Sequence, residues 1–291
     1  MWQTLTISTL EQGLVYAPMV LGVYLTFRVL NYADLSVDGS LPLGAAIAAH
    51  LIASGADPWY ASLLAFIGGA VAGMTTGLLH TRLRIAPLLS GILTMTALYS
   101  VNLRVMGKAN VPLIRATTVF TQFGELGLPT QIAVIVLSAI TLAIFVGCIY
   151  WFLQTEIGLA VRATGDNERM IIAQGVNTET TKIIALSISN ALVAFSGAYV
   201  AQSQGFADVG MGIGTIVAGL ASVIMGEALF GKSSIFRSLM AVIGGSIVYR
   251  LILGLVLWFG LTPTDLKLMT AIIVVLALAW PSFRHRGHGQ S

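Results

Sequence analysis

The sequence is poor in charge, since Asp, Glu, Lys and Arg make up only 9% of its 291 residues. Its single cysteine, Cys148, lies in an apolar run and leaves no internal disulfide framework. The four histidines lack the spacing of metal ligands, and no Ser-His-Asp or Cys-His set is visible. We therefore expect no catalytic residue, metal or cofactor in this chain, and the net charge of +3 gives no indication of nucleic-acid binding.

Apolar residues are what the sequence has in abundance. They make up 56% of the chain, and the mean hydropathy is +0.88. A soluble domain cannot bury so much apolar surface. The first residues, MWQTLTISTLEQG, have no basic n-region and no small-residue cleavage site, so they do not read as a removable signal peptide. The composition predicts an all-α polytopic membrane protein, with residues 1–291 forming one transmembrane domain.

About nine segments are long and apolar enough to cross a bilayer, which takes about 20 residues in a helix. Two of them are short, so the count lies between eight and ten. The candidate spans are 10–30, 40–54, 59–80, 86–106, 131–153, 181–203, 212–231, 236–258 and 267–281.

Basic residues form clusters that fall on one side of a nine-span arrangement. By the positive-inside rule this side is the cytoplasm, so we expect the N-terminus outside and the C-terminus in the cytoplasm. Lys108 and Arg115, in an outer segment, run against the rule. The clusters are Arg82 and Arg84; Arg162, Arg169 and Lys182; Lys232 and Arg237; and Arg284 and Arg286.

The two halves of the sequence resemble each other. The run YADLSVDGSLPLGAAIAA from Tyr32 aligns with FADVGMGIGTIVAGLASV from Phe206, an offset of 174 (206 − 32). The run SLLAFIGGAVAG from Ser62 aligns with SLMAVIGGSIVY from Ser238, an offset of 176 (238 − 62). Five spans separate the two starts, and an odd number inverts the second unit. The pattern predicts inverted repeats over about 10–106 and 181–281, which favours a transporter with a pathway at the midplane.

A polar segment at 154–182, QTEIGLAVRATGDNERMIIAQGVNTETTK, interrupts the apolar spans. We expect a short helix in it, capped by Asp166 or Asn167 and ended by Gly175. Its apolar face would be Met170, Ile171 and Ala173, with charged edges at Glu168 and Arg169. A folded loop of this size favours docking to a soluble partner, and an idle connector is the alternative.

The run RATGDNERMIIAQGVNT resembles the cytoplasmic coupling segment of bacterial ABC-importer permeases of the branched-chain amino-acid and ribose type. The resemblance extends from LEQGLVYAPMVLGVYLTFRVLNYADLSVDGS to GLASVIMGEALFG. Within this family the chain is similar to permeases proposed to import aromatic amino acids, through LNYADLSVDGS, PLLSGILTMTALYSVNLRVMGKAN and RATGDNERM.

The resemblance implies a permease subunit in a bacterial inner membrane. Its partners would be a second permease copy, two ABC ATPase subunits that bind ATP-Mg, and an extracytoplasmic substrate-binding protein. Amino acids are the first expectation for the substrate, with nucleosides or sugars as the alternative. The residues that would couple to the ATPase are Arg162, Gly165, Asp166, Asn167, Glu168, Arg169, Met170, Ile171 and Gly175.

One motif is typical of a different function, the binding of a nucleotide. GEALFGKS, from Gly226 to Ser233, matches the phosphate-loop pattern G-x-x-x-x-G-K-[ST]. That loop needs a buried strand before it and a helix after it, whereas the preceding TIVAGLASVIM reads as a membrane span. We expect Lys232 to be an interfacial residue and this chain to bind no nucleotide.

Polar residues inside or beside the spans are candidates for a pathway or gate. Asp34 and Asp38 precede the second span, near the inner mouth, and Asp208 occupies the repeat position near the outer mouth. Capping of the span that follows is the alternative role for Asp38 and Asp208. An ion-coupled transporter or channel is the rival function, and it would favour a carboxylate in mid-membrane. The pathway candidates are Asp34, Ser36, Asp38, Thr96, Tyr99, Asn102, Asp208 and Arg250.

Overall fold

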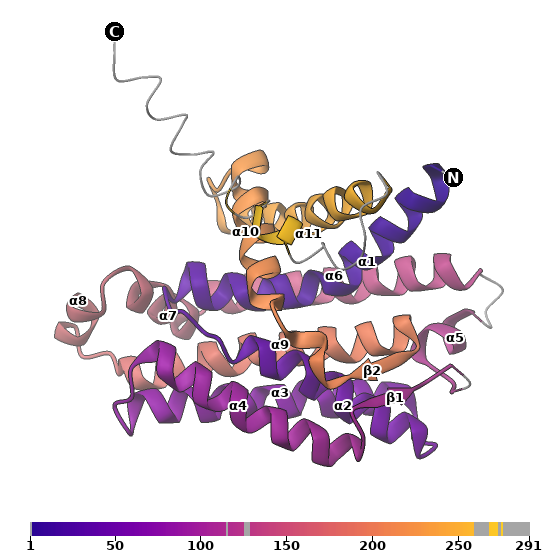
Figure 1. Ribbon diagram of the computed structural model, residues 1–291. Helices are drawn as coiled ribbons and strands as arrows, with labels where there is room; N and C mark the ends of the chain where they lie inside the picture. Colours follow the sequence, from indigo (N-terminus) through magenta and orange to yellow (C-terminus); the bar gives the residue numbers. More distant parts are fainter. Residues whose placement is uncertain (1, 115, 125–128, 259–267, 273–274, 276–291) are drawn as a thin grey trace, which may run out of the picture.

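The computed structural model describes residues 2–114, 116–124, 129–258, 268–272 and 275. Within these ranges the chain is almost entirely helical, with one two-stranded sheet (Figure 1). The fold class is therefore all-α, as predicted. In chain order the elements are α1 (Trp2–Val23), the π-helical η1 (Tyr24–Val29), α2 (Val37–Ala53), α3 (Pro58–Thr81), α4 (Pro87–Met106), β1 (Asn110–Pro112), α5 (Val119–Gly124), α6 (Thr130–Gln154), α7 (Glu156–Asp166), α8 (Glu168–Ala173), α9 (Thr178–Gln204), β2 (Phe206–Asp208), the 3-10 helix η2 (Val209–Gly212), α10 (Thr215–Phe230) and α11 (Ile235–Trp258).

Seven helical segments of the described chain are long and apolar enough to cross a membrane. The short second span of the prediction corresponds to α2, an apolar helix of 17 residues. The ninth expected span, 267–281, lies mostly outside the described residues. The seven segments are Thr6–Val29, Pro58–Thr81, Pro87–Met106, Gln131–Gln154, Thr178–Gln204, Val209–Phe230 and Ile235–Val256.

The outer faces of these helices are apolar. On α3, Leu63, Ile67, Val71 and Met74 follow one another at helical spacing, and each is about half exposed. Such a stripe is stable only against lipid or another protein. The described chain is thus a multi-pass membrane protein whose outer surface matches the bilayer.

Small residues let the helix backbones approach closely. A Cβ added to Gly73 of α3 would lie 2.1 Å from the carbonyl oxygen of Leu186 in α9, and one on Gly245 of α11 would lie 2.0 Å from that of Ser222 in α10. No side chain larger than hydrogen fits at these contacts. Close backbone packing commonly stabilises the association of membrane helices, because the hydrophobic effect contributes little to helix association within lipid.

The order of elements recurs in the two halves. A long helix, an irregular break, a short helix and a long helix appear as α1, 30–36, α2 and α3, and again as α9, 205–214, α10 and α11. The halves interlock, because α3 packs along α9 and α11 packs along α1. In the second break, β2 pairs antiparallel with β1, with Val111 opposite Ala207. The inversion of the second unit stays a prediction.

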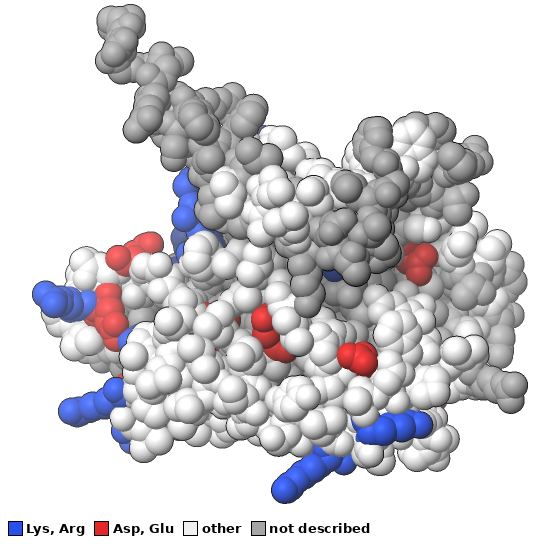
Figure 2. Space-filling view, in the orientation of Figure 1, with Lys and Arg blue, Asp and Glu red and all other residues white. Residues whose placement is uncertain are grey.

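The two ends of the bundle differ in charge. Figure 1 shows α7 and α8 at one end and α5, β1 and β2 at the other. At the α8 end, Lys182 lies beside His80, and Arg82 lies 3.9 Å from Glu179. On the face drawn in Figure 2, blue and red residues gather at this end, and a second blue group lies toward the opposite end. Members of three clusters that the sequence assigns to one side thus lie near α7 and α8: Arg82, Arg162 with Lys182, and Lys232.

Candidate functional site

The polar segment 154–182 folds into two helices, where the sequence suggested one. Residue Asn167 has extended backbone (φ −156°) and separates α7 from α8. Its side-chain oxygen accepts a hydrogen bond from the amide of Met170 at 3.1 Å, so Asn167 is the N-cap. Asp166, the alternative cap, is instead the last residue of α7. Gly175 lies in the left-handed region (φ +85°) just after α8, as expected.

Helix α7 lies against the membrane helices. Val161 is fully buried, and the Thr164 hydroxyl is 3.0 Å from that of Thr181 in α9. A Cβ on Gly165 would lie 2.0 Å from the carbonyl oxygen of Val29, so α7 touches the end of η1 backbone to backbone. Arg162, on the same helix, is partly exposed. Helix α7 is therefore seated directly on η1 and α9.

The outward face of α8 differs from the face expected. Ile171 is only 6% exposed and packs into the chain itself, so it is not available to a partner. Met170 and Ile172 are exposed by 51% and 53%, and Arg169 and Ala173 are exposed beside them. The exposed apolar surface of α8 is therefore Met170 with Ile172. The expected pairing of Met170 with Ile171 is wrong because the chain's own core takes Ile171.

Glu168 anchors α8 instead of forming its outer edge. Its carboxylate accepts hydrogen bonds from the Lys182 ammonium and from the Thr178 hydroxyl at 3.3 Å, both on α9. Partial burial raises the pKa of Glu168, but the hydrogen bond and charge of Lys182 lower it further, so the pKa lies below its ordinary value. Glu168 is thus ionised at neutral pH and ties α8 to a membrane helix.

The first break is held by a buried polar network. Asp34 is 3% exposed and accepts hydrogen bonds from the Ser36 amide and hydroxyl and from the Asn190 amide group at 2.8 Å. The Asn190 oxygen in turn accepts from the hydroxyls of Ser36 and Ser40. Asn190 sits in the middle of α9, so the network fixes the irregular backbone of 30–36 to that helix. Buried polar groups satisfied in this way specify one arrangement.

Asp38 joins the two halves of the chain. It lies in the first turn of α2, yet its carboxylate accepts hydrogen bonds from the amides of Gly214 and Ile216 at 3.0 and 2.8 Å and from the Thr215 hydroxyl at 2.9 Å. It therefore caps α10, whereas the alternative role considered for it in the sequence was to cap its own helix. The two breaks meet at this point. The placement of Asp38 near the inner mouth stays a prediction.

Asp208 makes its hydrogen bonds within and beside the second break, residues 205–214. Its carboxylate accepts hydrogen bonds from the Gly210 amide at 2.7 Å and from the Asn110 side chain at 3.3 Å. The first bond caps η2, the local role considered as the alternative. The second fixes the strand pair β1–β2. Asp208 therefore lies at the β1 end of the molecule.

The three polar candidates on α4 face different surroundings. Asn102 is 1% exposed and donates to the carbonyl of Gly39 at 3.1 Å. Tyr99 is 55% exposed, and the exposed Thr96 donates its hydroxyl hydrogen to backbone carbonyls of its own helix. The structure therefore does not bring these three residues together at one site.

Arg250 faces a pocket of about 370 Å³ beside the second break. Its guanidinium carbon lies 3.6 Å from the centre of the Tyr16 ring, a cation–π contact between α11 and α1. Among the residues that the structure describes, Arg250 makes no ion pair with a carboxylate.

The motif GEALFGKS does not form a phosphate loop. Gly226 to Phe230 belong to α10, and a Cβ on Gly226 would lie 2.1 Å from the carbonyl of Ala241, so this glycine serves helix packing. Lys232 follows the end of that helix and lines a pocket of about 250 Å³ with Arg28 and Arg162. A helix in place of the loop removes the cradle of backbone amides that a nucleotide needs.

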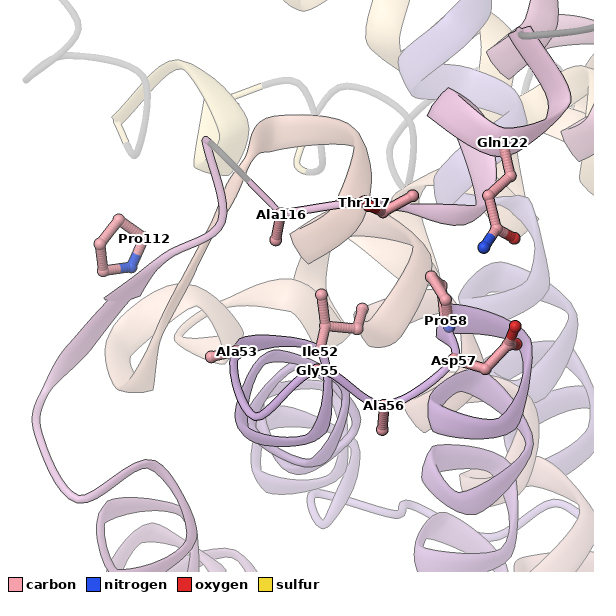
Figure 3. Close-up of a pocket in the computed structure, with 10 residues that line it drawn as sticks. All are labelled: Ile52, Ala53, Gly55, Ala56, Asp57, Pro58, Pro112, Ala116, Thr117 and Gln122. Atoms are coloured by element: carbon pink, nitrogen blue, oxygen red, sulfur yellow. The ribbon is translucent and has the colours of Figure 1, made fainter.

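A larger pocket of about 700 Å³ opens at the β1 end of the molecule (Figure 3). The turn between α2 and α3 forms one wall, and another is formed by Pro112, Ala116, Thr117 and Gln122. Figure 3 shows the polar ends of Asp57 and Gln122 near Pro58 on one side, with Pro112 on the other. The pocket is open to the surface.

Sequence reasoning missed two important residues, Asn190 and Tyr16. Asn190 was visible as a polar side chain within the apolar run ALSISNALVAF, which is a functional signal in a membrane span. Tyr16 gave no such signal, because an aromatic residue in a span is ordinary and its contact with Arg250 is long-range.

Comparison with known proteins gives concordant matches. The family model described as branched-chain amino acid transport system, permease component, matches residues 5–279. The tyrosine transport system permease protein of Clostridioides difficile is 43% identical over 94% of this chain and 90% of that protein. An uncharacterized protein of Rickettsia prowazekii is 32% identical over 94% of this chain and 96% of its own. The ribose import permease protein of Bacillus subtilis is 28% identical over 60% of this chain and 53% of its own length. No solved structure matches the chain significantly.

Proposed function

The chain belongs to the family of branched-chain amino-acid transport permease components, and we propose that it carries an aromatic amino acid inward. It is the membrane-spanning permease subunit of an ATP-driven ABC importer for amino acids, which removes the rival ion-coupled transporter. The observation that supports the aromatic substrate is the 43% identity, over nearly the whole chain, to a tyrosine transport permease. The ribose permease matches less of the chain at lower identity, so a sugar is the weaker candidate.

The substrate is tested by uptake into vesicles that contain the assembled transporter. We expect tyrosine, phenylalanine or tryptophan to accumulate with ATP, and leucine and ribose to accumulate far less. The binding protein that associates with the complex should retain the same ligand during purification. Uptake of leucine or ribose in preference to all three aromatic amino acids would contradict the proposal.

The proposed assembly has two copies of this chain, two ATPase subunits that bind ATP-Mg, and a substrate-binding protein, in a bacterial inner membrane. The concentration of Lys and Arg near α7 and α8 supports a cytoplasmic location for this end. The N-terminus is then outside and the C-terminus cytoplasmic. The pocket between Asp57 and Gln122 (Figure 3) faces outward in this orientation and suits docking of the binding protein.

Segment α7–α8 is our candidate for the contact with the ATPase. A coupling element must present an apolar anchor and stay rigid under load. Met170 and Ile172 provide the anchor because both are about half exposed on one short helix. Rigidity comes from the Asn167 cap, the buried Ile171 and the bond between Glu168 and Lys182. Burial of such anchors carries most of the free energy of an interface.

The test compares aspartate substitutions along α8. Met170→Asp and Ile172→Asp should each weaken ATPase association by about 2 kcal/mol, or about thirtyfold, and abolish most uptake. Gln174→Asp is the matched control, since it adds the same charge at an exposed polar position and should leave both nearly unchanged. Co-purification of the ATPase and substrate uptake are measured, with thermal stability of the isolated permease as the folding control. If the Met170 and Ile172 variants behave like the control, α8 is an idle connector.

The substrate pathway is proposed to run past the meeting point of the two breaks. Support comes from the network of Asp34, Ser36 and Asn190 and from the link between Asp38 and α10, which place polar groups in an otherwise apolar bundle. Broken helices at the meeting of two repeats are the usual place for a transporter site. The further candidates along it are the exposed Thr96 and Tyr99, the buried Asn102, and the partly exposed Asp208 and Arg250.

A further inference from the structure

The pocket beside the second break joins elements that are distant in the sequence. It measures about 370 Å³, within the usual range for small-molecule sites. Its walls come from α1, from η2 and the start of α10, from α11, and from residues 270–271. The lining residues are Tyr16, Met211, Ile213, Gly214, Thr215, Val217, Ala218, Tyr249, Arg250, Thr270 and Ala271.

The wall of this pocket cannot face lipid. Residues 209–214, at the start of the apolar segment Val209–Phe230, are not α-helical, and Ile213 among them is 67% exposed. Irregular backbone at membrane depth is tolerated only where protein covers it or where it lines a water-filled cavity. The exposed side of the pocket must therefore meet water or another protein, which in the proposed assembly is the pathway beside the second permease copy.

Arg250 is the group in this wall that needs an anion. It lies within the apolar segment Ile235–Val256, where a charged side chain is costly. The positive end of α10 is already neutralised, because Asp38 accepts the amides of Gly214 and Ile216. Arg250 has no carboxylate partner in the described chain, and its guanidinium makes a cation–π contact with the ring of Tyr16. The guanidinium lies over that ring, and within the described residues it donates no hydrogen bond.

We infer that this pocket binds the substrate amino acid during passage, with its α-carboxylate on Arg250 and its side chain against Met211 and Ile213. A guanidinium pairs with a carboxylate through two parallel hydrogen bonds, which gives both energy and orientation. Thioether and aliphatic groups make favourable contacts with an aromatic ring. The Tyr16 ring positions Arg250. The inference rests on the proposed function and assigns the carboxylate subsite to this chain, in addition to any selection by the binding protein.

The first test measures tyrosine uptake by the complete transporter in vesicles. Arg250→Gln should lower uptake at least about tenfold, because an unpaired substrate carboxylate is then buried without its partner. Arg250→Lys keeps the charge but loses the two parallel hydrogen-bond donors of the guanidinium, so its uptake should lie between that of the unsubstituted transporter and that of Arg250→Gln. Arg104→Gln is the matched control, since Arg104 is an exposed arginine in the last turn of another span, and it should transport normally. ATPase co-purification and thermal stability should stay unchanged in all three variants.

The second test removes the binding protein as a source of specificity. Photo-labelling of the permease–ATPase complex with 4-azidophenylalanine should mark peptides of α1 or α11. Excess tyrosine should block this labelling, whereas tyramine, which lacks the carboxylate, should not. Equal competition by tyramine, or undiminished uptake by Arg250→Gln, would overturn the inference while leaving the proposed function intact. Absence of aromatic amino-acid uptake by the unsubstituted transporter would instead overturn the proposed function.

Discussion

Replacement of Asp38 should reveal how strongly the two halves of the chain depend on each other. The carboxylate accepts two amides and one hydroxyl at the start of α10, across 176 residues of sequence. Loss of an N-cap costs about 0.5–2 kcal/mol, and an amide left unpaired in a partly buried position costs about 1–3 kcal/mol. Because these costs overlap, we expect Asp38→Ala to lower the free energy of unfolding by about 2–3 kcal/mol.

The thermal midpoint of the purified permease measures this loss. At about 2 °C per kcal/mol for a chain of this size, Asp38→Ala should lower Tm by about 4–6 °C. Asp57→Ala is the matched control, because Asp57 caps α3 through the amides of Trp59 and Tyr60 at an exposed turn where water can replace it. The control should lose about 2 °C or less. If both variants lose equally, Asp38 is an ordinary cap and the halves are not joined there.

Three further predictions concern nucleotide binding, sidedness and pH. Lys232→Ala should leave ATP hydrolysis by the assembled transporter within about severalfold of normal, and photo-crosslinking of ATP to this chain would contradict that reading. In a Cys148→Ser background, a cysteine replacing Arg84 should react with an impermeant reagent only from the cytoplasm and one replacing Ser54 only from outside, whereas labelling of both from one side would show that α3, the span between them, does not cross the membrane. The pKa of Glu168 is lower in the folded protein than its ordinary value of 4.5. Its contribution to the stability of α8 should therefore be complete at neutral pH, decrease as the pH falls below 4.5, and be lost once the pH is below the pKa of the folded protein. Hydrogen exchange of the α8 amides should follow this curve, and Glu168→Gln should flatten it.

Local rules predicted the features that depend on local structure. Hydropathy located the spans, because lipid requires long apolar helices. Asn167 and Gly175 were identified as helix ends, since a cap and a left-handed turn need only residues close in sequence. The short α2 was found but gave an uncertain span, because it starts at a break inside the bundle.

The expectations that the structure changed concern residues whose orientation and partners are set by packing between distant parts of the chain. Met170, Ile171 and Ile172 are consecutive apolar residues, so the sequence does not say which of them turns inward. The spacing of three between Thr96, Tyr99 and Asn102 rotates each residue by about 60° from the one before, which spreads the set over about 120° of the helix. Asp38 looked like the cap of its own helix because the capping rule considers only neighbours, whereas its partners lie in the other half.

The contacts around the proposed coupling segment α7–α8 also indicate how a movement there would reach the proposed pathway. Glu168 binds Lys182 near the start of α9, and Gly165 lies against the carbonyl of Val29 at the end of η1. From Lys182, α9 continues to Asn190, whose amide holds Asp34 in the first break. From Val29, the chain enters the same break within a few residues. A push on α8 therefore acts on both supports of that break, and a shift of α9 relative to η1 changes the position of Asp34. Because Asp38 follows in the next turn and caps α10, the same displacement is passed on to the second half.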